Sequence, residues 1–270
     1  MPHPVGEAAA RALGRVARVR LPVRVSRWVV RRYARHFDVA LSDVDPLALE
    51  EGFATLDAFF TRRLRSGIRM VDRDPDTLVS PSDGTLREVL DLDDDAEVTV
   101  KGRAYSLSGL LANPDHARAF RGGKIASIYL HPRDYHRVHC PTDALGHEVT
   151  LVPGRLLPVN DAAVERRPDL FARNERMIHM LEAGCGPLAV VMVAAFGVGH
   201  MTCSYARIEP HPRKLRRHTL DPPVRLAKGD EIGVFHLGST VLVAVPPGVE
   251  VVAPLGRIRF GAPLFREARP

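Results

Sequence analysis

Downstream of Gly67, most apolar residues fall in short runs. Residues 97–101, 124–130 and 188–196 are examples, and Pro, Gly and Asp separate such runs from one another. Short runs rich in branched residues with turn chemistry between them are typical of strands, and few long helical periods occur among them. The pattern predicts a mainly antiparallel β core, either a sandwich or a barrel-like sheet.

In residues 1–65 the apolar residues recur at the spacing of a helix rather than in short runs. Asp45-Pro46 is typical of a helix start, and Ser66-Gly67 ends the pattern. Apolar residues recur at helical spacing in two stripes, one of Leu21, Val25, Trp28, Val29 and Tyr33, the other of Phe53, Leu56, Phe60 and Leu64. We therefore predict an α+β protein with a helical region at residues 1–65 and a catalytic β-rich domain at residues 66–270.

Residues 8–36 form a strongly basic segment, with nine arginines and no acidic residue. Arg24, Arg27, Arg31 and Arg35 fall largely away from the apolar stripe. Two interpretations fit: a helix packed on the core with solvated arginines, or an interfacial anchor for anionic membranes. The whole chain carries a net charge of +6, which suits nucleic acid or a lipid surface as partner. Only Trp28 and Tyr33 are interleaved with the arginines, so stacking platforms for bases are not evident.

Length, hydrophobicity and cysteine content limit the kind of protein this chain can be. A chain of 270 residues can bury one large core. Its longest apolar run, residues 188–198, is shorter than the ~20 residues of a spanning helix, and the N-terminus lacks a secretory h-region. Three cysteines without CxxC spacing, Cys140, Cys185 and Cys203, argue against a disulfide framework.

One serine stands where a strand is expected. Residues 236–241 read HLGSTV, inside an apolar run, so Ser239 lies between Gly238 and a β-branched residue. The ordinary interpretation is a buried serine bonded to a neighbouring carbonyl. Two upstream segments favour a chemical role instead.

These segments supply an acid and a base. Residues 80–86 read SPSDGTL and place Asp83 at a turn, while residues 129–141 read YLHPRDYHRVHCP, with three histidines in nine residues. Acid, base and hydroxyl are the components of a nucleophilic triad. His131, His136, His139 and Cys140 are also competent metal ligands, but no fourth ligand stands at a recognisable spacing, and we expect no metal. We interpret the acidic residues 91–97 as an exposed turn.

The three segments resemble those of the pyruvoyl-dependent phosphatidylserine decarboxylases. Further motifs occur in that family's order, namely FFTRRL at Phe59, KGRAYSL at Lys101, VPGRL at Val152 and LFARNER at Leu170. The likeness spans roughly residues 53–247. His131 and Cys140 depart from the family pattern, and neither is among the residues of the triad.

The resemblance implies a self-processing mechanism. His139, oriented by Asp83, would take the Ser239 proton, and the serine oxygen would attack the Gly238 carbonyl and convert the amide to an ester. Elimination and hydrolysis would leave a pyruvoyl group at position 239, the cofactor, and release ammonia. The products would be a large chain 1–238 and a small chain 239–270. The pyruvoyl group would form a Schiff base with phosphatidylserine and yield phosphatidylethanolamine, a step of phospholipid biosynthesis.

A second role concerns the carbanion left by decarboxylation. Either His136 or His139 could protonate it, and the sequence does not choose between them. On an extended strand the two side chains would point to opposite faces, whereas a turn of helix would place them together. Because the resemblance gives both an active-site role, we predict a bent or helical segment between Pro132 and Pro141.

Alternatives of other kinds remain open. A relative could decarboxylate a free amino acid, and a serine hydrolase could use the same triad, although Ser239 lacks a GxSxG elbow. Given the family, we expect a phospholipid substrate, an anionic membrane partner, no nucleic acid and a peripheral position on the cytoplasmic face of the cell membrane. A homodimer is left open. The residues at 173–176 could hold the lipid phosphate or form a charged turn.

Overall fold

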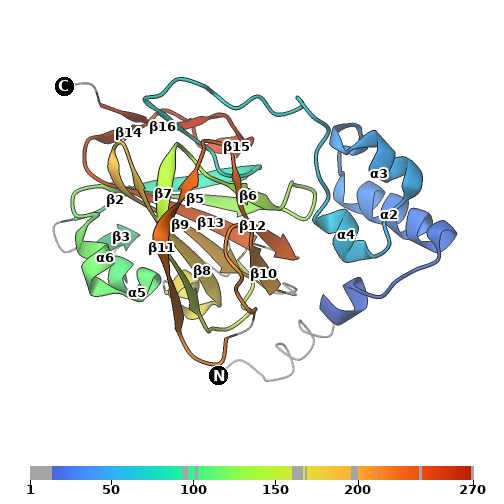
Figure 1. Ribbon diagram of the computed structural model, residues 1–270, viewed down its shortest axis with the longest axis horizontal. Coiled ribbons are helices and arrows are strands. Elements are labelled where there is room, and N and C mark those ends of the chain that lie inside the picture. The colour runs from blue at the N-terminus through green and yellow to red at the C-terminus, as the bar shows by residue number, and fades with distance from the viewer. Residues whose placement is uncertain are drawn as a thin grey trace.

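The computed structural model describes residues 14–93, 97–100, 103–159, 167, 169–195, 200–210, 212–236 and 239–268. Antiparallel sheets dominate it, and helices gather near the N-terminus (Figure 1). The predicted α+β class with a mainly antiparallel β core is confirmed. The main sheet is open, so of the two arrangements predicted for the core the barrel-like one is not formed.

The N-terminal region contains α2 (Val23–Phe37), η1 (Leu41–Asp43), α3 (Pro46–Glu51) and α4 (Leu56–Phe60). Asp45 caps α3 by accepting a hydrogen bond from the amide of Leu47, and Pro46 occupies the first turn, as the sequence predicts. Thr55 caps α4 through the amide of Ala58. These helices lie together at one side of the β structure (Figure 1).

The buried face of α2 differs from the predicted stripe. Ser26, Val30 and Ala34 face inward, and Val30 and Ala34 join Val39 and Phe59 in a small hydrophobic cluster. Trp28 is 67% exposed and Val25 is 45% exposed. Of the two interpretations of the apolar stripe, packing on the core therefore does not hold for Trp28 and Val25, and the inward face includes Ser26, which donates its hydroxyl to the carbonyl of Phe53. A polar residue on the inner face cannot be recognised from hydrophobic periodicity.

The main sheet has eight antiparallel strands. In spatial order they are β11 (Arg216–Leu226), β7 (Ala144–Val152), β8 (Arg176–Ala183), β9 (Gly186–Ala194), β13 (Ser239–Val245), β5 (Lys124–Leu130), β2 (Gly84–Asp91) and β15 (Gly256–Ile258). All seven residues of β13 are buried, and the strand pairs with β9 on one side and β5 on the other. The strand that begins at Ser239 therefore lies inside the sheet rather than at an edge.

Smaller elements surround this sheet. One three-stranded sheet joins β10 (His200–Cys203), β12 (Glu231–His236) and β6 (Arg137–His139), and another joins β1 (Thr77–Val79), β16 (Pro263–Glu267) and β14 (Val249–Val251). Other elements are the hairpin of β3 (Glu97–Val100) and β4 (Arg103–Ser106) and the short helices α5 (Leu107–Leu111), α6 (Pro114–Arg118) and α8 (Leu170–Arg173).

The cysteines, the helix lengths and the domain boundary bear on three further expectations. Cys140, Cys185 and Cys203 are all unpaired. None of the helices in the described part of the chain is long and apolar enough to cross a membrane. The predicted boundary between the helical region and the β-rich domain, at residues 65 and 66, stays a prediction. It falls in the irregular segment between the end of α4 and the start of β1.

Candidate active site

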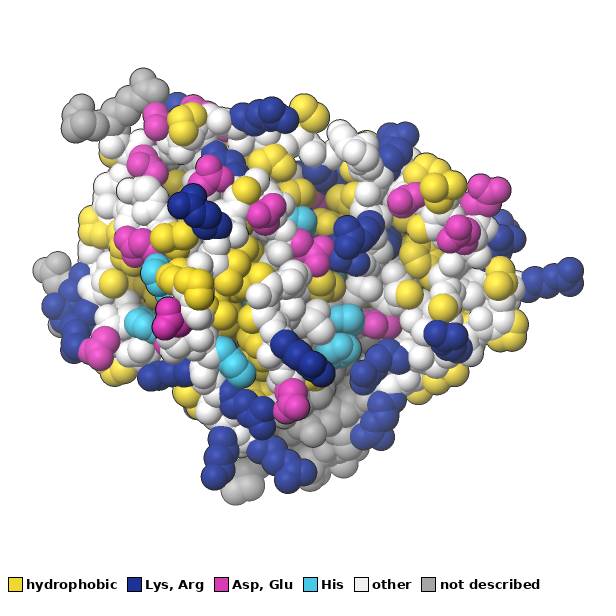
Figure 2. Space-filling model, in the orientation of Figure 1, with side chains coloured by type: hydrophobic (Ala, Val, Ile, Leu, Met, Phe, Trp, Pro, Cys, Tyr) yellow, Lys and Arg dark blue, Asp and Glu magenta, His cyan; other side chains and the backbone are white. Residues whose placement is uncertain are grey.

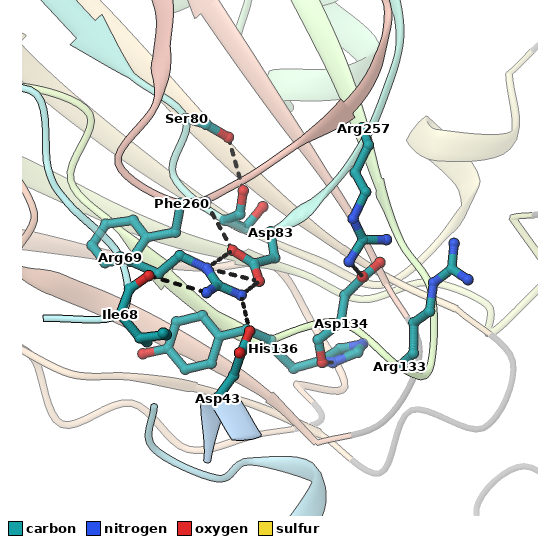
Figure 3. Close-up of polar contacts among 12 residues, drawn as sticks. Asp43, Ile68, Arg69, Ser80, Asp83, Arg133, Asp134, His136, Arg257 and Phe260 are labelled. Atoms are coloured by element: carbon teal, nitrogen blue, oxygen red, sulfur yellow. Dashed lines mark hydrogen bonds and ion pairs between the residues drawn. The ribbon is translucent and has the colours of Figure 1, made fainter. Parts of the chain in front are cut away.

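Asp83 is held at the turn before β2 by an arginine that the sequence analysis did not single out. Its buried carboxylate accepts hydrogen bonds from Arg69 Nε at 3.0 Å and Arg69 Nη2 at 2.6 Å, and from the amide of Phe260 at 2.9 Å (Figure 3). Gly84 permits this turn, because a Cβ there would meet the carbonyl oxygen of Tyr129 at 2.6 Å.

Arg69 connects Asp83 to the helical region. Its Nη2 also lies 2.9 Å from the carboxylate of Asp43 in η1. Burial lowers the pKa of Arg69, but hydrogen bonds and charges from Asp83 and Asp43 outweigh that effect and raise the pKa above its ordinary value. The arginine is therefore a fixed cation between two carboxylates.

His139 ends β6 and makes polar contacts with both ring nitrogens. Nδ1 lies 2.8 Å from the carbonyl oxygen of Gly229, and Nε2 lies 3.0 Å from the hydroxyl of Tyr135. A carbonyl oxygen can only accept a hydrogen bond, so Nδ1 carries the ring proton. Nε2 therefore accepts a hydrogen bond from the Tyr135 hydroxyl. Burial lowers the pKa of His139 to about 4. The ring is therefore neutral at pH 7, and its unprotonated nitrogen, Nε2, is already hydrogen-bonded to Tyr135.

His136 is fully buried, and unlike His139 it has a ring nitrogen without a hydrogen-bond partner among the described residues. Its Nδ1 donates to the carbonyl of Asp134 at 2.9 Å, and its ring lies 3.9 Å from the ring of Phe60. Its Nε2 is buried without a hydrogen-bond partner among the described residues. Burial, together with the charge of Arg62, lowers the pKa of His136 to about 3. His136 thus presents a free basic nitrogen.

The backbone between the two prolines is bent and not helical. A turn at residues 132–134 bends the chain before the histidine pair, but Arg137–His139 is the short strand β6, so the stretch that joins His136 to His139 is extended and not helical. The histidine rings pack against different partners, His136 on Phe60 and His139 on Phe260. Strand pairing of Arg137 and Val138 with β12 explains the extended conformation.

Ser239 is the first residue of β13 and is almost completely buried. Leu130 of β5 and Ala194 of β9 lie opposite it in the ladder. Its hydroxyl has no hydrogen-bond partner among the described residues, so the ordinary interpretation of a serine bonded to a neighbouring carbonyl does not apply. A buried, unpaired hydroxyl is costly and calls for an explanation. Gly238, the other residue of the predicted cleavage site, lies outside the described residues.

Strand pairing brings the predicted residues into one region. The amide of His139 donates to the carbonyl of Pro81, two residues before Asp83, at 2.8 Å. The carbonyl of His136 accepts the amide of Phe235 at 3.0 Å, four residues before Ser239. Within the described structure, however, Asp83 is bonded to Arg69 and not to His139, and neither is bonded to Ser239. The triad of Asp83, His139 and Ser239 stays a prediction.

Comparison with known proteins identifies the family. The model of the family described as phosphatidylserine decarboxylase matches residues 56–266. Proteins named phosphatidylserine decarboxylase proenzyme are similar to the chain: one from Azotobacter vinelandii is 38% identical over 97% of this chain and 93% of its own length, and one from Bordetella petrii is 39% identical over 88% and 84%. The chain belongs to the phosphatidylserine decarboxylase family. The predicted family and the enzyme class, a carboxy-lyase, are confirmed.

Around these candidate residues, the structure adds three that sequence reasoning missed. Tyr135 stands in the histidine-rich segment and could have been noticed, whereas Arg69 and Phe260 lie in segments without a recognisable motif. Arg69 and Phe260 are far from Asp83 and His139 in sequence, so their contacts with these residues can be seen only in the folded structure. The structure describes no group of three or more His, Cys, Asp or Glu side chains that could hold a metal ion.

The segment at residues 173–176 proves to be structural at two of its positions. Arg176 is buried and donates to the carbonyls of Gly109, Leu110 and Ala172, while the side-chain Nδ2 of Asn174 donates to the carbonyl of Leu157. Arg173 is paired with Asp169. Because Asn174, Glu175 and Arg176 are buried between α8 and β8, the segment does not form an exposed charged turn, and Arg176 is already bound to backbone carbonyls.

Proposed function

We propose that this chain is a self-processing precursor that decarboxylates phosphatidylserine to phosphatidylethanolamine in phospholipid biosynthesis. The observation that carries the proposal is Ser239, a buried hydroxyl without a partner at the start of the central strand, in a family whose relatives are named proenzymes. A serine hydrolase has less support, because Ser239 does not stand in the GxSxG elbow from which a hydrolase presents its serine to an external carbonyl.

A pyruvoyl group derived from Ser239 fits the position. Decarboxylation needs an electron sink that no standard side chain offers, and a ketone at the start of the small chain would supply it by condensing with the substrate amine. The buried, unpaired oxygen of Ser239 marks where that ketone would lie. Burial lowers the pKa values of His136 and His139 to about 3 and 4, so both rings are neutral at pH 7 and each can accept a proton.

Processing would begin with a proton transfer to imidazole. The Ser239 hydroxyl loses its proton to Nε2 of a histidine, and its oxygen attacks the carbonyl carbon of Gly238. The C–N bond breaks, the nitrogen takes the proton, and an ester remains. Loss of the Cα proton of residue 239 then expels the Gly238 carboxylate, and water hydrolyses the resulting enamine to the ketone and ammonia. We assign the first base as His139, with His136 as the competing candidate because its Nε2 is free.

The two chains would stay together after cleavage. The small chain 239–270 contains β13 in the middle of the main sheet, β15 at its edge, and β14 and β16 in a second sheet. Nearly every residue of β13 has a strand neighbour on both sides. Large and small chains are thus partners in one fold.

A basic pocket beside the acid–base residues supports an anionic substrate. It has a volume of about 200 Å3, and Arg63, Arg65, Arg69, Tyr135 and Phe260 are among its lining residues. Arg69 is neutralised by two carboxylates, while the exposed Arg63 and Arg65 have no ion-pair partner in the described structure. Phosphatidylserine carries a phosphate that a free amino acid lacks, so the pocket favours the lipid.

We also propose a peripheral position on the cytoplasmic face of the cell membrane. Large apolar side chains are exposed across the helical region, namely Val16, Val19, Val23, Val25, Trp28 and Leu47. Hydrophobic and basic side chains lie next to one another over these helices (Figure 2). Exposed apolar residues with a cationic surround are typical of interfacial anchors on anionic lipid.

Electrophoresis and mass spectrometry of the purified protein test the proposal. We expect a large fragment ending at Gly238 and a small fragment whose first residue is blocked as pyruvoyl. Ser239→Ala should remain one chain without decarboxylase activity. Full-length protein with decarboxylase activity would contradict the pyruvoyl mechanism, and cleaved protein that acts on free serine but not on phosphatidylserine would favour the amino-acid alternative.

A further inference from the structure

An acid–base pair connects the helical region to the segment that precedes the proposed cleavage site. Asp57 lies in the first turn of α4, and its carboxylate oxygens are 2.9 and 3.1 Å from Nδ1 of His236. The side chains of His236 and Asp57 are only 16% and 14% exposed. His236 ends β12, two positions before Gly238.

The ring of His236 is fixed on more than one side. The ring of His200 stacks on it, with centroids 3.8 Å apart and planes 11° apart, and the two residues face each other across the β10–β12 ladder. Nε2 lies 3.4 Å from the hydroxyl oxygen of Thr202. Since a carboxylate accepts hydrogen bonds, Asp57 keeps the proton on Nδ1 and sets the orientation of the imidazole.

His236 stands where the chain changes sheets. β12 belongs to the three-stranded sheet with β10 and β6, whereas β13 begins at Ser239 in the centre of the main sheet. Only two residues, Leu237 and Gly238, join these fixed ends. The ring that Asp57 fixes is therefore only three positions along the chain from Ser239.

We infer that Asp57 positions His236 and, through it, the peptide bond between Gly238 and Ser239 for self-cleavage. The inference rests on the proposed function and adds a task for the helical region, which would take part in processing as well as in membrane contact. Attack on a carbonyl requires close alignment of oxygen and carbon, and a misplacement of ~1 Å can cost about 100-fold in rate. Loss of one half-buried contact should therefore slow cleavage measurably without unfolding the chain.

The test is a double-mutant cycle on the cleavage rate. Asp57→Asn, His236→Gln and the double variant are made by cell-free synthesis, and the cleaved fraction is followed over time on gels. We expect each single variant to cleave roughly 10-fold more slowly, and the double variant to be no slower than the slower single variant, because both lose the same contact. Asp57→Glu should recover part of the rate. Glu50→Gln, which removes an acid on α3 away from the pair, is the matched control and should cleave like the parent.

Two further measurements separate positioning from folding. In the uncleavable Ser239→Ala background, Asp57→Asn should leave the thermal midpoint nearly unchanged and speed amide exchange mainly in β12. Cleavage of Asp57→Asn at the parent rate, additive effects in the cycle, or a general loss of protection would each overturn the inference. A parent chain that does not cleave would instead refute the proposed function, so the two failures are distinguishable.

Discussion

The ring of Phe260 stacks on the imidazole of His139, with centroids 3.8 Å apart and planes 18° apart. The amide of the same residue donates to Asp83. Phe260 thus connects an acid and a base that do not bond to each other, and it belongs to the proposed small chain. The C-terminal segment therefore contributes more than the cleaved serine, because it encloses the histidine that we assign as base.

Removal of this ring should change the pH dependence of the enzyme. Burial holds the pKa of His139 near 4, so Phe260→Ala, which admits water, should raise that pKa toward the ordinary value of about 6.5. The acid limb of the decarboxylation rate should move to higher pH in the processed protein. Phe53→Leu, in the separate helical cluster, is the control. An unchanged acid limb would show that the titration of His139 does not limit the rate.

Tyr135 offers a way to decide between the two histidines. Its hydroxyl occupies Nε2 of His139, so Tyr135→Phe should free that nitrogen and leave self-cleavage as fast as in the parent, or faster. His139→Ala should slow cleavage by ~100-fold or more, the usual loss for a general base. If His136→Ala stalls cleavage while His139→Ala does not, the free Nε2 of His136 is the base. Time courses from cell-free synthesis measure all three variants.

The fold was largely predictable, because short apolar runs and a helical N-terminal period report burial directly. The inward face of α2 was not, since it includes Ser26, which donates a hydrogen bond to a backbone carbonyl. For the site, the motifs supplied Asp83, His136, His139 and Ser239 as candidates. Sequence could not supply Arg69, which pairs with the predicted acid, or Asp57 and His236, because those contacts arise when α4 and β12 meet in space.

The basic pocket predicts a binding defect that spares the chemistry. Arg63→Gln and Arg65→Gln remove charges near the Tyr135 side of the site, so the KM for a short-chain phosphatidylserine should rise by about 10-fold for the double variant, with kcat little changed. Arg225→Gln, an exposed arginine on β11, is the matched control. Equal KM values in the parent and the double variant would show that the phosphate binds elsewhere.

Buried histidines make the fold sensitive to acid. Burial lowers the pKa values of His136, His139 and His179 to about 3, 4 and 3, whereas the unfolded chain has values near 6.5. Between pH 6.5 and these lower values the unfolded state binds more protons, so stability is full above pH 6.5 and falls as the pH falls. His179→Gln should flatten this decline by ~1 kcal/mol or more between pH 7 and 4.5.

The acid-stability measurement uses denaturant unfolding of the uncleavable Ser239→Ala chain at several pH values. His147→Gln, which replaces an exposed histidine of β7, serves as control and should keep the parent slope. A His179→Gln variant whose stability declines as steeply as the parent would mean that carboxylates, and not this buried histidine, govern the acid response.

Membrane attachment through the helical region is the remaining prediction. Basic residues near an anionic surface contribute about 1 kcal/mol each, and the exposed Trp28 adds apolar contact, so a few arginines suffice for reversible binding. Changing Arg24, Arg27 and Arg31 to Gln should reduce co-sedimentation with anionic vesicles, and Trp28→Ala should reduce it further. Because the attraction is screened over roughly 8 Å at physiological ionic strength, added salt should weaken parent binding.

Point variants suit this test better than truncation, because the helices also contact the catalytic region. Tyr33 donates its hydroxyl to the carbonyl of Pro132, and Arg62 donates to the carbonyls of Arg133 and Asp134. A variant with Arg121 and Arg225 changed to Gln controls for lost charge on the β structure. Lost vesicle binding with intact self-cleavage would assign membrane contact to the arginines of α2, whereas equal binding by all variants would exclude α2 as the anchor.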